Sequence, residues 1–166
     1  MRFCDCWEVI RLTPLLLLGE LKSFLEGVVA DYLLETNKGH MKAPQVVEGW
    51  LPPKESNDIP DVPYVILRLI DGEDNTDSAR VNVKILVGSY SEDTDGWKDS
   101  INVLLRIRQC LLINRTLGKK FRMELPLKWK LFEEQPYPIW IGEIITIWTV
   151  ALPIEQVEED VYEYQE

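Results

Sequence analysis

The stretch QPYPIWIGEIITIWTVALP, residues 135–153, constrains the fold most, because its pattern predicts a strand that is apolar on both faces. Successive side chains of a strand point to opposite faces of the sheet. One face of this strand carries Trp140, Gly142, Ile144, Thr146, Trp148, Val150 and Leu152. The other face carries Ile141, Glu143, Ile145, Ile147, Thr149 and Ala151. Helices on one side of a sheet cover only one of these faces, so the second face needs a partner of its own.

Residues 64–70 have the same property, with apolar side chains at almost every position. Two such strands predict a large apolar patch on the outer face of the sheet, which is typical of an interaction surface. We expect contacts between subunits at six positions: Tyr64, Ile66, Trp140, Ile144, Trp148 and Val150. The alternative also stays open that the first twelve residues, or a short strand near residues 46–51, fold over the patch and cover it.

Two further stretches predict helices. Thr13-Pro14 is typical of an N-cap followed by proline at the first helical position, and apolar residues at helical spacing then predict a helix over about residues 14–36. The sequence Asn-Lys-Gly at 37–39 is expected to end it. The acidic run SEDTDG at 91–96 is expected to open a second helix, with Thr94 or Asp95 as its cap. Apolar positions from Trp97 onward follow one helical face until Asn114.

Alternation of apolar and polar residues predicts the remaining strands. Residues 80–87 follow residues 64–70 through DGEDNTDSA, which predicts a hairpin with a projecting acidic loop. The acids of this loop are Asp71, Glu73, Asp74 and Asp77. Residues 121–131 alternate over their whole length, and Pro126 within them indicates an edge or a bulge because proline has no amide donor.

Together these elements predict an α+β fold: a four-stranded, mostly antiparallel sheet with two helices packed on one face. The expected order is helix, strand, strand, helix, strand, strand. A single domain over residues 1–153 suits the length of 166 residues. Residues 154–166 contain six acids and no base, so we expect a disordered acidic tail there.

Composition narrows the classes of partner. The formal net charge is −10, with 18 Lys and Arg against 28 Asp and Glu, which argues against a basic groove for nucleic acid. No apolar run reaches the ~18 to 20 residues of a membrane-spanning helix, and none has the pattern of a signal peptide. Three cysteines without a spacing framework do not indicate a secreted scaffold. A cytoplasmic protein with no membrane partner is the default expectation.

Motifs for chemistry are sparse. The chain has one histidine, His40, and its glycines form no phosphate loop. Residues 71–77 depart from the order of a calcium loop, and Cys4 with Cys6 lack two further zinc ligands. We therefore expect no catalytic residues, no metal and no cofactor. Trp97 and Trp129 lie on patterns that predict burial in the core. A small hydrolase or a carbohydrate-binding module is the alternative class, and it would need carboxylates, or Trp140 and Trp148, together in one cleft.

The runs VPYVILRLIDGEDN, VKILVGSYSEDTDGWKD and LGKKFRMELPLKWKLFEEQPYPIWIGEIITIWTVALP resemble the tail terminator (tail completion) family of long-tailed phages and prophages. The resemblance spans about residues 63–153. It is carried by the patterns G-x-Y-x-E-D-x-x-G-W and P-x-W-x-G-E-x-x-T-x-W. Cys4, Cys6 and the acidic tail have no counterpart in it.

The resemblance implies a structural protein without enzymatic activity. Its members are expected to form a homo-oligomeric, hexameric ring that caps the head-proximal end of the tail tube and docks to the neck, or connector, protein. The ring would assemble in the host cytoplasm and remain in the virion tail, with DNA passing through it without specific binding. Asp71, Glu73, Asp74 and Asp77 would then line the channel, where like charge opposes adhesion of DNA. A head–tail joining protein of the same fold is the alternative within this class.

Overall fold

The computed structural model describes residues 13–54 and 60–153. Over these ranges the chain forms helices α2 (Pro14–Val29) and α3 (Trp97–Ile113) and two sheets. The small sheet pairs β1 (Leu34–Glu35) with β2 (Met41–Lys42). The large sheet has six strands in the spatial order β3 (Gln45–Glu48), β4 (Tyr64–Asp74), β5 (Ala79–Tyr90), β8 (Ile139–Val150), β7 (Phe121–Leu131) and β6 (Thr116–Leu117).

The pair of β5 and β8 forms the centre of the large sheet. The two strands pair antiparallel without interruption, from Ala79 opposite Val150 to Tyr90 opposite Ile139. β4 flanks β5, and β7 flanks β8, both antiparallel. The β7–β8 register shifts between Glu124 and Lys128. Pro126 lies within that shift and cannot donate to the ladder, so the predicted irregularity at Pro126 is confirmed.

The predicted four-stranded, mostly antiparallel sheet, with its order of helix, strand, strand, helix, strand, strand, is wrong. The large sheet has six strands and is mixed, because β3 runs parallel to β4 from Gln45 opposite Tyr64 to Glu48 opposite Leu67. A further two-stranded sheet accompanies it. β3 overlaps the short strand suggested near residues 46–51, which the predicted sheet did not include, and β6 has only two residues, too few for alternation to reveal. The strand with which each short strand pairs is determined by the tertiary fold, and local periodicity in the sequence does not contain this information.

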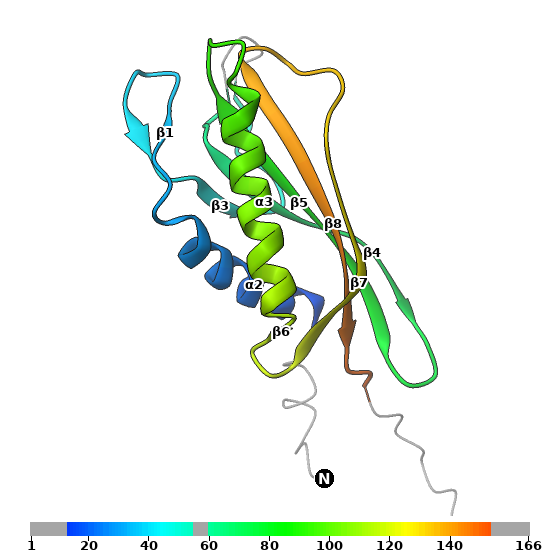
Figure 1. The fold of residues 1–166 in the computed structure, drawn as a ribbon. Helices are drawn as coiled ribbons and strands as arrows, with labels where there is room; N and C mark the ends of the chain where they lie inside the picture. The colour runs from blue at the N-terminus through cyan, green and yellow to red at the C-terminus, as the bar shows by residue number, and fades with distance from the viewer. Residues whose placement is uncertain (1–12, 55–59, 154–166) are drawn as a thin grey trace, which may run out of the picture.

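Both helices lie on the same face of the large sheet (Figure 1), and the main core fills the space between them and the strands. α3 packs on β5 and β8, and α2 packs on α3, β3 and β4. The fully buried side chains come from every third or fourth helical position and every second strand position, as the two periods require. They include Leu17, Leu21, Leu25, Leu104, Ile107, Leu111, Val65, Leu67, Val83, Ile85, Ile144 and Trp148.

Helix α2 begins as predicted but ends earlier. The Thr13 Oγ1 accepts the backbone N–H of Leu16 at 3.3 Å, which confirms the N-cap. The helix ends at Val29 instead of near residue 36, and the following residues form the β1–β2 hairpin. Gly39, with φ of 80°, lies in the turn of this hairpin. Helix C-caps and hairpin turns both need a residue with positive φ, so the sequence could not separate the two.

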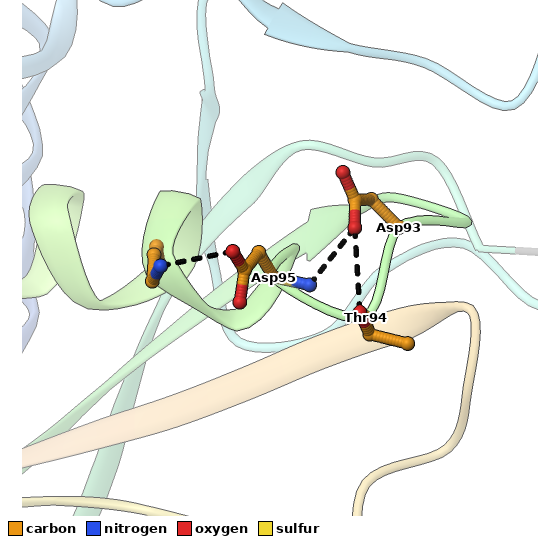
Figure 2. A network of polar contacts seen from close by, with 4 residues as sticks. Asp93, Thr94 and Asp95 are labelled. Atoms are coloured by element: carbon orange, nitrogen blue, oxygen red, sulfur yellow. Dashed lines mark hydrogen bonds and ion pairs between the residues drawn. The ribbon is translucent and has the colours of Figure 1, made fainter.

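Helix α3 has the predicted bounds, but its predicted cap by Thr94 or Asp95 is absent. The N-cap residue is Gly96, which makes no side-chain capping bond. Figure 2 shows that Asp93 instead accepts the N–H of Asp95 at 3.1 Å and the hydroxyl of Thr94 at 3.5 Å. Asp95 pairs with the Lys98 Nζ at 2.9 Å. These acids therefore stabilise the loop before the helix. They also lie close to the N-terminus of the helix, where negative charge interacts favourably with the helix dipole.

Some expectations lie outside the described residues. These are the disordered acidic tail at 154–166, the cover by residues 1–12, and the roles of Cys4 and Cys6. No helix in the described ranges is long and apolar enough to cross a membrane.

Trp148 is the largest fully buried side chain, and its removal tests the main core. Its Nε1 donates to the Thr146 Oγ1 at 2.8 Å, and that hydroxyl donates to the Val83 carbonyl at 2.9 Å. We expect Trp148→Ala to lower the free energy of unfolding by roughly 3–5 kcal/mol in urea titrations, because it leaves a large cavity. Trp129→Ala on neighbouring β7 is the matched control. Its side chain is 46% exposed, so we expect a loss of no more than about 1 kcal/mol. Equal losses for the two variants would contradict the central role of Trp148.

Candidate functional site

The two motifs that carry the phage resemblance meet at one end of the β5–β8 pair. The first motif spans residues 88–97 and the second spans residues 138–148. The register places Ser89 opposite Trp140 and Tyr90 opposite Ile139. We call this region, residues 88–97 together with residues 137–142, the motif joint.

Trp140 is the side chain that connects the two halves of the motif joint. Its Nε1 donates to the Ser91 carbonyl at 3.0 Å, across 49 residues of sequence. Gly96 lies against the same indole, and a Cβ at this position would lie 2.6 Å from the Trp140 Nε1. The Tyr137 ring meets the indole edge-on, with centroids 6.2 Å apart, and its hydroxyl donates to the Glu92 carbonyl at 2.8 Å. The loop before α3 is thereby tied to the turn before β8.

At two other motif glycines, a large side chain packs directly against the backbone of the sheet. A Cβ on Gly88 would lie 2.6 Å from the Tyr64 Cε1, so the Tyr64 ring lies directly over this glycine. A Cβ on Gly142 would lie 2.7 Å from the Leu104 Cδ1 of α3. The spacing of glycine and tryptophan in the two motifs was the sequence signal for this region, although it did not show that the motifs touch.

The chain covers part of its own outer sheet face, the face that points away from the helices. A second apolar cluster, which we call the outer cluster, buries Val62, Tyr64, Ile66, Leu86, Tyr90 and Ile139. Leu51 comes from the connection between β3 and β4, and Phe132 from the connection between β7 and β8, and both pack against it. The pKa of the Tyr64 phenol is raised above its ordinary value because the side chain is buried, and the positive charge of nearby Arg68 opposes part of this shift. Self-covering, one of the two alternatives left open by the sequence, thus accounts for this half of the face.

The six residues expected at a subunit interface do not form one exposed surface. Tyr64 and Ile66 are buried in the outer cluster. Trp140 is half-buried in the motif joint. The other three, Ile144, Trp148 and Val150, are buried in the main core beneath the helices. Alternation assigns residues to the two faces of a strand, but it does not say which face the helices cover.

The tryptophans also differ from expectation. Trp148 is fully buried, so it cannot form an exposed platform with Trp140 for a sugar ring. Trp97 and Trp129 are 38% and 46% exposed, so their predicted burial in the core is wrong.

An open pocket of about 420 Å³ lies on the outer face beside the outer cluster. Its charged lining residues are Arg68, Lys84 and Glu143. Glu143 is nearly buried, and its carboxylate pairs with Lys84 at 3.2 Å and with Lys130 at 3.4 Å. The Arg68 Nε donates to the Gly49 carbonyl at 2.9 Å, and its guanidinium lies 5.3 Å from the centre of the Trp50 ring. Each of the three charges is thus held by a partner within the chain.

The acids expected in a projecting loop lie mostly on a strand. β4 extends to Asp74, so Asp71, Glu73 and Asp74 belong to its exposed end, and Asp77 lies in the turn before β5. Asp71 accepts a hydrogen bond from the Asn82 amide on β5. Within residues 13–54 and 60–153, no three acids, histidines or cysteines lie close enough together to hold a metal ion.

Comparison with known proteins gives matches among solved structures. No protein-family model matches the chain, and no curated protein matches it in sequence. A chain of the solved structure described as "Virion of native gene transfer agent (GTA) particle" is 12% identical, with a TM-score of 0.44. The alignment covers 81% of this chain and 94% of that chain. Likeness at this level is too low to assign a shared fold or a shared function.

Substitution of Gly88 tests the close packing of the outer cluster. Gly88→Ala places a methyl group against the Tyr64 ring, so we expect a loss of about 1–3 kcal/mol in the free energy of unfolding. Gly27→Ala is the matched control, because a Cβ there meets nothing within 4 Å and the position is helical. That change should instead stabilise the protein by up to about 1 kcal/mol. Equal responses of the two variants in thermal or urea unfolding would contradict this description of Tyr64.

Proposed function

We propose that this chain is a structural protein of a phage or prophage virion, and within that class a tail terminator. The sequence resemblance over residues 63–153 suggests this function. The similar chain from the gene transfer agent particle also comes from a virion, although that likeness is too low to support the class.

The observation that carries the proposal is the motif joint. The motif residues whose contacts are described above, among them Gly88, Gly96, Trp140, Gly142 and Trp148, pack within the subunit and fix the position of one element against another. A sequence signature composed of packing residues suits a protein that acts through its shape and surfaces. It would be unusual for an enzyme, whose signature residues converge on a cleft.

A second observation favours assembly. On the outer face, residues 13–54 and 60–153 leave a hollow of about 390 Å³ lined by Ile70, Ile145 and Ile147, with Lys84 and Lys128 among its other lining residues. An apolar floor with charged surroundings is a common composition for a protein interface.

In this function the protein performs no covalent step and needs no cofactor. A ring of subunits would bind the last layer of the tail tube, prevent addition of further tube subunits, and present its opposite side to the neck protein. DNA would pass through without specific binding, since an acidic protein repels the phosphate backbone. That the acids of residues 71–77 line such a channel remains a prediction from the sequence.

Electron microscopy of the protein mixed with tail tubes tests the proposal. We expect a ring-shaped density at one end of each tube, together with tubes that no longer elongate when fresh tube protein is added. Binding to isolated capsid necks, without any density at tube ends, would favour the head–tail joining alternative. Absence of binding to both would reject the proposed class.

Trp140→Ala provides a variant for this assay. It removes the side chain that ties residues 91–96 to β8, so we expect weaker capping at a given protein concentration. Trp50→Ala removes another tryptophan, one that is 71% exposed, and serves as the control for loss of an indole. Equal capping by the two variants and the unaltered protein would show that the motif joint is not needed for assembly.

A further inference from the structure

Two segments on opposite sides of the large sheet carry charges of opposite sign. Residues 71–77 contain four acids and no base, and we call them the acidic corner. Residues 115–122 contain four bases and no acid, and we call them the basic corner. The bases are Arg115, Lys119, Lys120 and Arg122. β5 and β8 separate β4, which carries most of the acidic corner, from β7, where the basic corner ends.

The register places the two corners at the same height on opposite edges of the sheet. Glu73 lies opposite Arg80, Arg80 lies opposite Thr149, and Thr149 lies opposite Arg122. One row across the sheet therefore leads from an acid on β4 to a base on β7, and β6 continues the row with Thr116 opposite Arg122. Three strand steps of roughly 4.8 Å separate β4 from β7 by about 14 Å, so the corners are too far apart to neutralise each other within one chain.

The described residues around each corner neutralise only part of its charge. All of residues 71–77 are exposed, and none of the four acids forms an ion pair with a described residue, although Arg80 is adjacent by register. On the other edge, Arg115 and Arg122 share Glu124 at 3.7 and 3.9 Å. Glu20 of α2 also approaches the corner, near Gly118. Among the described residues, four bases against these two acids leave the basic corner positive.

The backbone at both edges is partly open and partly apolar. β3 pairs with β4 only as far as Leu67, and beyond it Ile70 is 49% exposed. β6 pairs with β7 only as far as Arg122, and beyond it Leu125 is 55% exposed. An open sheet edge is a surface on which another chain can pack. Two acidic corners repel each other, as do two basic corners, so charge permits only a contact between unlike corners.

We propose that the acidic corner of one copy of this chain docks against the basic corner of a second copy, and that this head-to-tail contact builds the ring. A contact between two different surfaces of the same chain is heterologous, and repetition of it closes into a ring when the rotation permits. The strand direction alternates from β4 through β5, β8 and β7 to β6. A copy added by rotation about the strand axis would therefore place its β4 antiparallel to β7 beyond Arg122 and parallel to β6. This proposal rests on the proposed ring function and assigns the four acids to a subunit contact in place of the channel lining.

A charge swap tests the contact. One variant carries Glu73→Lys and Asp74→Lys, and the other carries Lys119→Glu and Lys120→Glu. Each variant alone should self-associate at least about tenfold more weakly than the unaltered chain in sedimentation at low salt, because like charges now meet. An equimolar mixture should recover association, since each altered corner then finds a complementary one. Glu133→Lys with Glu134→Lys is the matched control, because it makes the same charge change on exposed residues of the β7–β8 connection.

Carbodiimide coupling, which joins a carboxylate to an amine in direct contact, provides a second measurement. In a mixture of isotopically light and heavy protein, we expect mixed crosslinks between residues 71–77 and Lys119 or Lys120. Two results would overturn the proposal: unchanged association of both swapped variants, or a lack of mixed crosslinks at the highest soluble concentration. Either result would mean that the charges only protect the sheet edges.

The same variants separate this proposal from the proposed function. Rings that depend on the swap but do not bind tail tubes would support the contact and reject the tail terminator function. Tube capping that is unaffected by either swapped variant would support the function and reject this contact.

Discussion

The uninterrupted pairing of β5 with β8 is the interaction on which the rest of the structure depends. Its register decides which side chains face the helices, because a slip of one residue would exchange the two faces of a strand. In the observed register Ile85 and Ile144 face the main core, and their neighbours Lys84 and Glu143 form an ion pair on the outer face. The motif joint lies at one end of this pair. The row that joins the two charged corners crosses it near the other end.

Close contacts between layers explain the composition of the motifs. Tyr64 crosses over Gly88 on the outer face, Leu104 packs onto Gly142 on the helical face, and Trp140 lies against Gly96 at the joint. In each case a large side chain occupies the volume that a Cβ would need. The motif glycines are thus explained by close packing: Gly96 contacts Trp140 of the other motif, whereas Gly88 and Gly142 contact Tyr64 and Leu104 outside the motifs.

The proposed function depends on the surfaces of the protein, and the β5–β8 pair determines where these surfaces lie. β5 and β8 hold the acidic corner and the basic corner apart, so their charges stay available for another molecule. The described residues cover the outer face beside β3 with the outer cluster and leave a hollow around Ile145 and Ile147. Unlike charges on two separate edges are what the proposed head-to-tail contact requires.

Local pattern by itself determined the elements that have a clear period: the bounds of α3 and β7, the N-cap of α2, and the irregularity at Pro126. It also located the acids of residues 71–77 and the two motifs. Only the tertiary structure decided which face of β8 the helices cover, and hence why Ile144, Trp148 and Val150 are buried. The parallel pairing of β3, the end of α2 at Val29 and the cover over Tyr64 were decided in the same way. The physical reason is that periodicity records the alternation of side chains along one element. The partner of each face is chosen by contacts between residues distant in sequence, and no local pattern contains them.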